Sequence, residues 1–243
     1  MKIIKLDAID STNSFLKDLV RNTALENFTT VIAKEQKKGR GQQAGSWVSE
    51  LGKNLTFSTY ASFSGLQVKH QKYLNFAVSL AVLEVLKYLE IPNLQIKWPN
   101  DILVGNDKIS GILIENTLKE QKIQAAIIGI GLNVNQESFP VFSRKAISIK
   151  KCLQKETNLQ DTLQLLLQRL QSKLTLLNEG QFQLLEAQYL DLLYKKNVPT
   201  TFKNRENVLF MGIIKGVSSE GKLQILLDDD SIQEFGIKEV SFA

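Results

Sequence analysis

The stretch KWPNDILVGNDKISGILIE, residues 97–115, decides the fold of this chain. An apolar run over residues 94–98 predicts a strand that ends in a Pro-Asn-Asp turn. Two further runs, joined by Gly105-Asn106-Asp107, predict a hairpin. Lys97 and Lys108 flank the Asn-Asp pair, and two ammonium groups beside a carboxylate suit a bound anion. The stretch therefore indicates an enzyme that activates a nucleotide.

A glycine loop, GRGQQAGSW over residues 39–47, follows the β-branched run TTVIA. Its three glycines allow backbone N–H groups to turn toward an anion. Arg40 adds a planar fork that suits a carboxylate or a phosphate, and Trp47 can stack on a base. The loop is neither a P-loop nor a dinucleotide fingerprint, because no Gly-Lys-Ser/Thr closes it and no helix pattern follows. It predicts a different kind of binding loop.

Two more segments carry features of a ligand site. GIGLNVN, residues 129–135, places glycines inside an apolar strand, where they mark a bulge or the close approach of a ligand or backbone. DSTN, residues 10–13, precedes helical spacing and supplies N-cap residues. Each segment alone also suits an ordinary cap, turn or crowded strand crossing. Their combination in one chain favours a shared pocket.

The remaining pattern places these motifs on strands and helices. Residues 54–60 and 125–134 predict strands, and residues 73–89 predict a buried helix. Residues 158–178 and 182–194 predict two amphipathic helices on the sheet, and a coiled coil is disfavoured because both segments are short. Short strands between turns then predict a small β-barrel. We expect an α/β fold with two domains, a ligand-binding domain over residues 1–195 and a small β domain over residues 196–243.

Composition narrows the class of protein. No apolar run approaches the roughly 20 residues of a membrane span. One cysteine and one histidine cannot form an intramolecular disulfide or a zinc site, so Cys152 and His70 are expected to be structural, and a cytoplasmic location is the default. The net charge of +5 is spread along the chain, which favours a small anion over DNA.

Together these segments resemble the biotin protein ligases, also called biotin–[acetyl-CoA-carboxylase] ligases. The resemblance rests on five motifs in the family's order: DSTN, EQxxGRG with Trp47, KWPNDI, KISGILIE and GIGLNVN. It implies a mixed β-sheet flanked by helices, like class II aminoacyl-tRNA synthetases, with an SH3-like domain at the end. It also implies two steps. Biotin and MgATP form biotinyl-5′-AMP and pyrophosphate, and biotin then passes to a lysine of a biotin carboxyl carrier protein.

The resemblance also implies residue roles. Lys108, Arg40, Asp101 and Lys97 would be catalytic, with Arg40 and Lys108 at the biotin carboxylate and α-phosphate, and Lys97 and Asp101 near the incoming lysine. The residues implied to hold biotin are Ser11, Thr12, Asn13, Gln36, Gly39, Arg40, Lys108, Gly111 and Gly131. Those implied to hold ATP or the adenylate are Arg40, Gly41, Gln42, Trp47, Asn100, Lys108 and Asn133.

Two departures from the family pattern matter. Many members read GRGRxGR, whereas this chain has Gln42 in place of a second arginine, and Ala44 and Gly45 in place of Gly and Arg. We expect weaker retention of the adenylate. DSTN begins at residue 10, which leaves no room before it for the helix-turn-helix domain of bifunctional members, so a monofunctional chain that binds neither DNA nor a membrane is expected. Monomer and homodimer both stay open.

Three rival functions remain. A lipoate ligase shares the fold and the adenylate chemistry, but Trp98-Pro99 and the GRG loop speak against it. Arg40 and Lys108 argue against a catalytically silent binding module. The absent DNA-binding segment disfavours a repressor.

Overall fold

Two β-sheets organise the computed structural model, which describes residues 2–140 and 145–243. The larger sheet has seven strands in the order β1-β2-β3-β7-β6-β5-β4. Their bounds are β1 (Ile3–Ile9), β2 (Thr30–Gln36), β3 (Leu55–Ser62), β4 (Leu94–Lys97), β5 (Asp101–Val104), β6 (Asp107–Lys119) and β7 (Lys122–Leu132). Only β1 and β2 run parallel, so the sheet is mixed, and the predicted fold class is confirmed.

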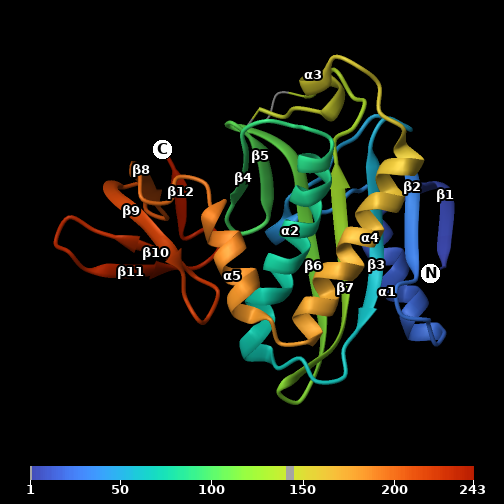
Figure 1. The fold of residues 1–243 in the computed structure, drawn as a ribbon, viewed down its shortest axis with the longest axis horizontal. Coiled ribbons are helices and arrows are strands. Elements are labelled where there is room, and N and C mark those ends of the chain that lie inside the picture. Colours follow the sequence, from blue (N-terminus) through green and yellow to red (C-terminus); the bar gives the residue numbers. More distant parts are fainter. Residues whose placement is uncertain (1, 141–144) are drawn as a thin grey trace.

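Three helices cover one face of this sheet (Figure 1). α2 (Gln71–Tyr88) lies against β4, β5 and β6, and α4 (Leu159–Asn178) and α5 (Phe182–Asp191) pack chiefly on α2. Most hydrophobic residues of α2 and α4 are buried in the main core, together with Ile128 and Ile130 of β7. The predicted helices at residues 73–89, 158–178 and 182–194 therefore exist as helices that cover the sheet. Smaller helices are η1 (Gln42–Ala44), η2 (Val68–His70) and α3 (Ile149–Leu153).

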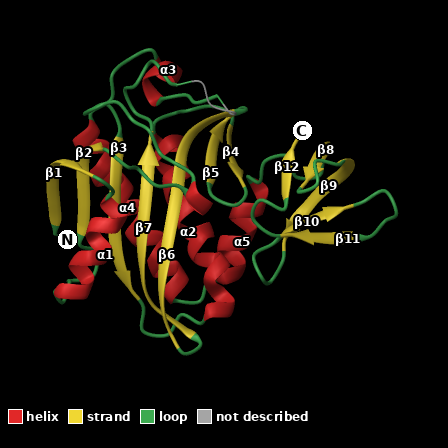
Figure 2. Ribbon diagram, turned by 180° about the vertical axis from the view of Figure 1, so that it is seen from behind, coloured by secondary structure: helices red, strands yellow, loops and turns green. Residues whose placement is uncertain are grey.

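The helix α1 (Thr12–Asn22) covers the opposite face (Figure 2). Leu16 of α1 is fully buried against Val31 of β2 and Ile127 of β7 in a second, smaller core. Successive side chains of a strand point to opposite faces, so Gly129 and Gly131 share the face of Ile127. Helix α1 covers only part of this face. Gly129 lies under Asn13 at the start of α1, whereas Gly131 lies under Trp47 and is only partly buried.

The second sheet stands beside the β4 edge of the first (Figures 1 and 2). Its antiparallel strands follow the order β11-β10-β9-β8-β12, with bounds β8 (Pro199–Asn204), β9 (Leu209–Val217), β10 (Leu223–Leu226), β11 (Ile232–Phe235) and β12 (Val240–Phe242). Trp98 Nε1 donates to the carbonyl of Gly221, 3.1 Å away, and ties the two sheets together. No helix within residues 2–140 and 145–243 has the length and apolar character that a bilayer crossing requires.

Candidate functional site

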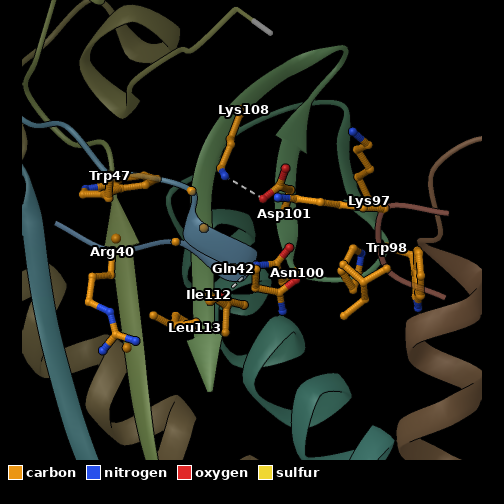
Figure 3. A pocket seen from close by; sticks show the side chains of 18 of the residues that line it. Arg40, Gln42, Trp47, Lys97, Trp98, Asn100, Asp101, Lys108, Ile112 and Leu113 are labelled. Atoms are coloured by element: carbon orange, nitrogen blue, oxygen red, sulfur yellow. Dashed lines mark hydrogen bonds and ion pairs between the residues drawn. The ribbon is translucent and has the colours of Figure 1, made fainter. Parts of the chain in front are cut away.

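A cavity of about 450 Å³ opens where the uncovered face of the large sheet meets the small sheet. That size is typical of small-molecule sites. The walls are the start of α1, the glycine loop, the β4–β5 turn, the middle of β6 and β7, and residues of β8 and β12. Figure 3 shows part of the side chains that line it. The motifs singled out in the sequence therefore meet at one place.

Two glycines form the floor of the cavity. Gly111 of β6 and Gly131 of β7 are direct partners in the strand register, and the Trp47 indole lies across both. A Cβ atom at Gly131 would stand 2.4 Å from Trp47 Cε2, and one at Gly111 would stand 3.1 Å from Trp47 Cζ3. Trp47 Nε1 is buried and donates to no acceptor in the described part of the chain. Only glycine allows an aromatic plane to lie this close to the strands.

Polar side chains at the start of α1 form one end of the cavity. Ser11 caps the helix, and the backbone N–H of Thr12 donates to Gln36 Oε1 at 2.8 Å. Thr12 Oγ1 donates to the same oxygen at 3.0 Å. Ser58 Oγ of β3 lies 2.7 Å from Thr12 Oγ1 and 2.5 Å from Asn13 Oδ1. Because Gln36 Oε1 already accepts twice, its Nε2 group remains to donate to a ligand.

Asn13 lies directly on Gly129. A Cβ atom at Gly129 would stand 2.2 Å from Asn13 Oδ1, so this glycine is also fixed by a close approach. The Asn13 amide nitrogen donates to Glu115 Oε2 at 2.9 Å and to the Leu113 carbonyl at 3.3 Å. Asn13 is almost fully buried. The polar end is thus a connected hydrogen-bond network rather than a set of separate groups.

Arg40 is held by Glu115. Its two terminal nitrogens lie 3.3 Å from the two Glu115 oxygens, and Nη1 also donates to Ser14 Oγ at 3.3 Å. In Figure 3 the Arg40 side chain points away from Lys108 and Asp101. The role of Arg40 at a ligand carboxylate and phosphate stays a prediction. The guanidinium is engaged by a protein carboxylate instead.

Burial disfavours the charged form of Glu115 and is the largest single influence on its pKa. The hydrogen bond from Asn13 and the charges of Arg40 and Lys17 oppose burial. Together they hold the pKa of this carboxyl below its ordinary value.

Lys108 and Asp101 form the charged centre of the cavity (Figure 3). The Lys108 ammonium lies 2.6 Å from Asp101 Oδ1 and 5.6 Å from the centre of the Trp47 ring system. Asp101 is the one carboxylate among the described lining residues. The β4–β5 turn that presents it contains a cis peptide between Trp98 and Pro99.

Lys97 and Asn100 flank this centre. The Lys97 ammonium lies 5.3 Å from the centre of the Phe242 ring of β12. Asn100 Nδ2 donates to the Ile112 carbonyl at 2.5 Å, which fixes the turn against β6. Lys97 therefore stands between the Asp101 side of the cavity and the small sheet.

Two residues of the predicted site do not line the cavity. Asn133 is buried, and both hydrogens of its amide are used, at 3.4 Å to the Lys108 carbonyl and at 3.0 Å to the Ile147 carbonyl. Gly39 begins the loop, and a Cβ atom there would stand 2.2 Å from the Trp47 carbonyl oxygen. Of the other predicted residues, all line the cavity: Ser11, Thr12, Asn13, Gln36, Arg40, Gly41, Gln42, Trp47, Lys97, Asn100, Asp101, Lys108, Gly111 and Gly131.

The sequence reasoning missed three contributors. Ser58 lies on the small polar face of the alternating strand NLTFSTY, a pattern that could have indicated a polar wall. Glu115 closes the KISGILIE motif but received no role. Lys238 lies outside every motif, yet its ammonium donates to the Gln43 carbonyl at 2.6 Å and ties the glycine loop to the small sheet.

Comparison with known proteins agrees with this geometry. The profile of the biotin/lipoate A/B protein ligase family matches residues 6–133, just over half of the chain. The chain belongs to the biotin/lipoate A/B protein ligase family. The match covers α1, the glycine loop and strands β2 to β7, which supply most of the cavity wall.

Individual members of this family show the extent of the likeness. The bifunctional ligase/repressor BirA of Bacillus spizizenii is 35% identical over 136 residues, 56% of this chain and 41% of that protein. Biotin–protein ligase 2 of Arabidopsis thaliana is 30% identical over 211 residues, 82% of this chain and 62% of that protein. The chain thus spans about two fifths of the length of the BirA relative.

Among solved structures, the biotin protein ligase of Aquifex aeolicus in complex with biotin and ATP superimposes with a TM-score of 0.80 at 27% identity. The alignment covers 100% of this chain and 98% of that one. This likeness extends through the small sheet, which lies beyond the residues that the family profile matches.

Proposed function

We propose that this chain is a biotin protein ligase. It activates biotin with MgATP to biotinyl-5′-AMP, releases pyrophosphate, and transfers biotin to a lysine of a biotin carboxyl carrier protein. One observation carries the proposal: a donor-presenting polar end, a flat glycine floor and the Lys108–Asp101 pair meet in a single cavity. The Aquifex aeolicus protein of the same fold is described as a complex with biotin and ATP, which supports the choice of substrates.

The first step joins two anions, the biotin carboxylate and the α-phosphate of ATP. Their repulsion is the main obstacle, so cations aimed at both groups lower the barrier. Lys108 holds an ammonium at the cavity centre, oriented by Asp101 at 2.6 Å. Arg40 adds a second cation once a ligand oxygen replaces Glu115 as its partner. The carboxylate oxygen attacks phosphorus, and pyrophosphate leaves with the Mg²⁺ that arrived on ATP.

Magnesium fits as part of the MgATP substrate. In the described ranges no group of three or more His, Cys, Asp or Glu side chains could hold a metal ion. Mg²⁺ commonly binds through one or two carboxylates plus substrate phosphates. Asp101 is the lining carboxylate that would face such an ion. The ATP phosphates would supply the other oxygen ligands of Mg²⁺.

The second step needs a neutral lysine amine. A free lysine has a pKa of about 10.4, so its deprotonation at pH 7 costs about 4.6 kcal/mol. The Lys97 ammonium beside the small sheet lowers the pKa of an incoming lysine by charge repulsion. Asp101, across the β4–β5 turn, accepts or orients the proton while the amine attacks the mixed anhydride and AMP leaves.

In this proposal the biotin ring binds at the polar end, which is formed by Ser11, Thr12, Asn13 and Gln36. The aliphatic side chain of biotin lies on the glycine floor. The nucleotide would lie along the glycine loop, with Gly41, Gln42, Trp47 and Asn100 around it. Gly39 would allow the close approach of the Trp47 carbonyl, and Asn133 would hold the backbone at Lys108. The division into residues 1–195 and 196–243, and the cytoplasmic location, belong to the same proposal.

Transfer of radiolabelled biotin to a carrier domain with MgATP tests the proposal. Pyrophosphate exchange measured with biotin, and again with lipoate in its place, distinguishes this function from that of a lipoate ligase.

Lys108→Ala should lower pyrophosphate exchange by about 100-fold or more, because it removes a cation aimed at the developing charge. Lys119→Ala, an exposed lysine on the same strand, is the matched control. Normal exchange in Lys108→Ala at an unchanged melting temperature would refute the assignment.

A further inference from the structure

The tip of the glycine loop is hydrogen-bonded to the turn between β11 and β12. The Lys238 ammonium donates to the Gln43 carbonyl at 2.6 Å, and Gln43 Nε2 donates to the Ile237 carbonyl at 3.4 Å. We call these two hydrogen bonds the loop clasp. They join residues that are 195 and 194 positions apart in the sequence. The mechanism above gives Lys238 no role.

Hydrogen bonds inside the loop fix its shape but not its place over the cavity. The Gly41 N–H donates to the Gly45 carbonyl at 2.7 Å, and the Gly45 N–H donates to the Gln42 carbonyl at 2.9 Å. Because donors and acceptors both belong to the loop, these bonds persist when the loop swings as a unit. Arg40 anchors the base of the loop to Glu115. The loop clasp anchors its tip.

Both residues of the shorter clasp bond have an unusual backbone. The φ angle is 44° at Gln43 and 63° at Lys238, in the left-handed region that residues with a side chain seldom adopt. Such conformations persist where the surrounding structure enforces them, and they cluster at ligand clamps. The turn that carries Lys238 is closed, because the Glu239 N–H donates to the Gly236 carbonyl at 3.1 Å and the Gly236 N–H donates to Glu239 Oε2 at 2.5 Å. The ammonium is therefore presented from a fixed backbone.

The loop clasp also brings a positive charge to a loop that has only one. Within residues 39–47 Arg40 is the single charged residue, and Glu115 engages its guanidinium. Gln42 stands where many biotin protein ligases have a second arginine. Lys238 and Gln42 both line the cavity, and the Lys238 ammonium is bonded to the residue that follows Gln42. A cation of the small sheet thus lies next to the position where the arginine is missing.

We infer that Lys238 is a positioning residue that holds the glycine loop over the nucleotide end of the cavity. Loops that close over a site keep a bound intermediate from leaving between two steps. The small sheet thereby sets how slowly the adenylate dissociates. The inference rests on the proposed function, because it assigns a retained adenylate to this cavity. Lys238 acts through the loop and does not need to touch the reacting atoms.

Lys238→Met tests the inference in the full-length chain, because it removes the donor and keeps an unbranched side chain. The first measurement needs no ligand. Trypsin cleaves after Arg40 when the loop leaves its place, so the cleavage rate, followed by mass spectrometry, reports the open population. It should rise about fivefold, since one hydrogen bond from a charged group is lost at an exposed site.

The second measurement is the release of biotinyl-5′-AMP, which should also become about fivefold faster. The dissociation constant for biotin, measured by isothermal titration calorimetry, should change less than about twofold, because the polar end of the cavity does not depend on the clasp. Lys238→Arg keeps a charged donor and should recover slow release. Lys215→Met is the matched control, an exposed lysine of β9 that does not line the cavity, and it should change neither rate.

Unchanged cleavage after Arg40 in K238M, or unchanged release of the adenylate, would overturn the inference. Equal losses of affinity for biotin and the adenylate together with a lowered melting temperature would also overturn it, because they indicate general destabilisation. A wild-type chain without biotin-dependent pyrophosphate exchange would instead refute the proposed function, and the cleavage rates would still decide whether Lys238 holds the loop.

Discussion

Gly131→Ala should displace the Trp47 indole from the floor of the cavity. The new Cβ would stand 2.4, 2.6 and 2.7 Å from three atoms of the ring system, whereas carbon atoms in contact prefer about 3.5–4.0 Å. The ring must therefore retreat by roughly 1 Å. Overpacking of this kind costs about 1–3 kcal/mol of folding stability, and the displaced ring should also lower kcat/KM for biotin activation.

Fluorine NMR with 5-fluorotryptophan measures the displacement directly, because the chain has two tryptophans. The Trp47 resonance should shift in Gly131→Ala, and the Trp98 resonance, tied to Gly221, should stay in place. Gly65→Ala is the matched control, since a Cβ there meets nothing within 4 Å and the glycine has no left-handed φ. A variant with an unmoved Trp47 resonance and unchanged kcat/KM would show that the glycine floor does not act as described.

Three further outcomes are expected. Gln42→Arg should slow dissociation of the adenylate about fivefold in a filter-binding assay, because a charged hydrogen bond is worth about 1 kcal/mol more than a neutral one, and an unchanged off-rate would contradict this. Asp101→Asn should alter the pH–rate profile of the transfer step, so identical profiles would remove Asp101 as a proton acceptor. Glu115 has a lowered pKa in the folded chain, so it stabilises the fold above about pH 4.3, and this contribution is lost as the pH falls further. Glu115→Gln should therefore show a shallower fall of melting temperature below that pH, and an equal fall would disprove the linkage.

The elements of the large sheet could be predicted because their signals are local. Alternation at residues 54–60, the apolar spacing of residues 73–89 and the turn at Gly105-Asn106-Asp107 each need only neighbouring residues to be read. Residues of all five motifs line one cavity, because the ends of strands and the start of α1 meet there with the middle of β6 and β7 on the same side of the sheet.

The partners of the site residues could not be predicted in the same way. Arg40 is 75 positions from Glu115 in the sequence, and Asn13 is 102 positions from it. No local pattern can therefore predict either hydrogen bond. Asn133 shows a second limit of local patterns. Its polar side chain suggested a ligand contact, whereas its amide nitrogen donates to two backbone carbonyls inside the protein. The strand β12 was too short to carry a pattern, yet its Phe242 lines the cavity.

The hydrogen bond between Lys238 and the Gln43 carbonyl has a consequence for biosynthesis, because the two residues are 195 positions apart. At about 5–20 residues per second, a ribosome adds that length in roughly 10–40 s. During this interval the glycine loop has been made but the wall that steadies it has not. The large sheet can assemble around an unfinished cavity, and translation speed over the last strands sets when a nascent chain first closes it.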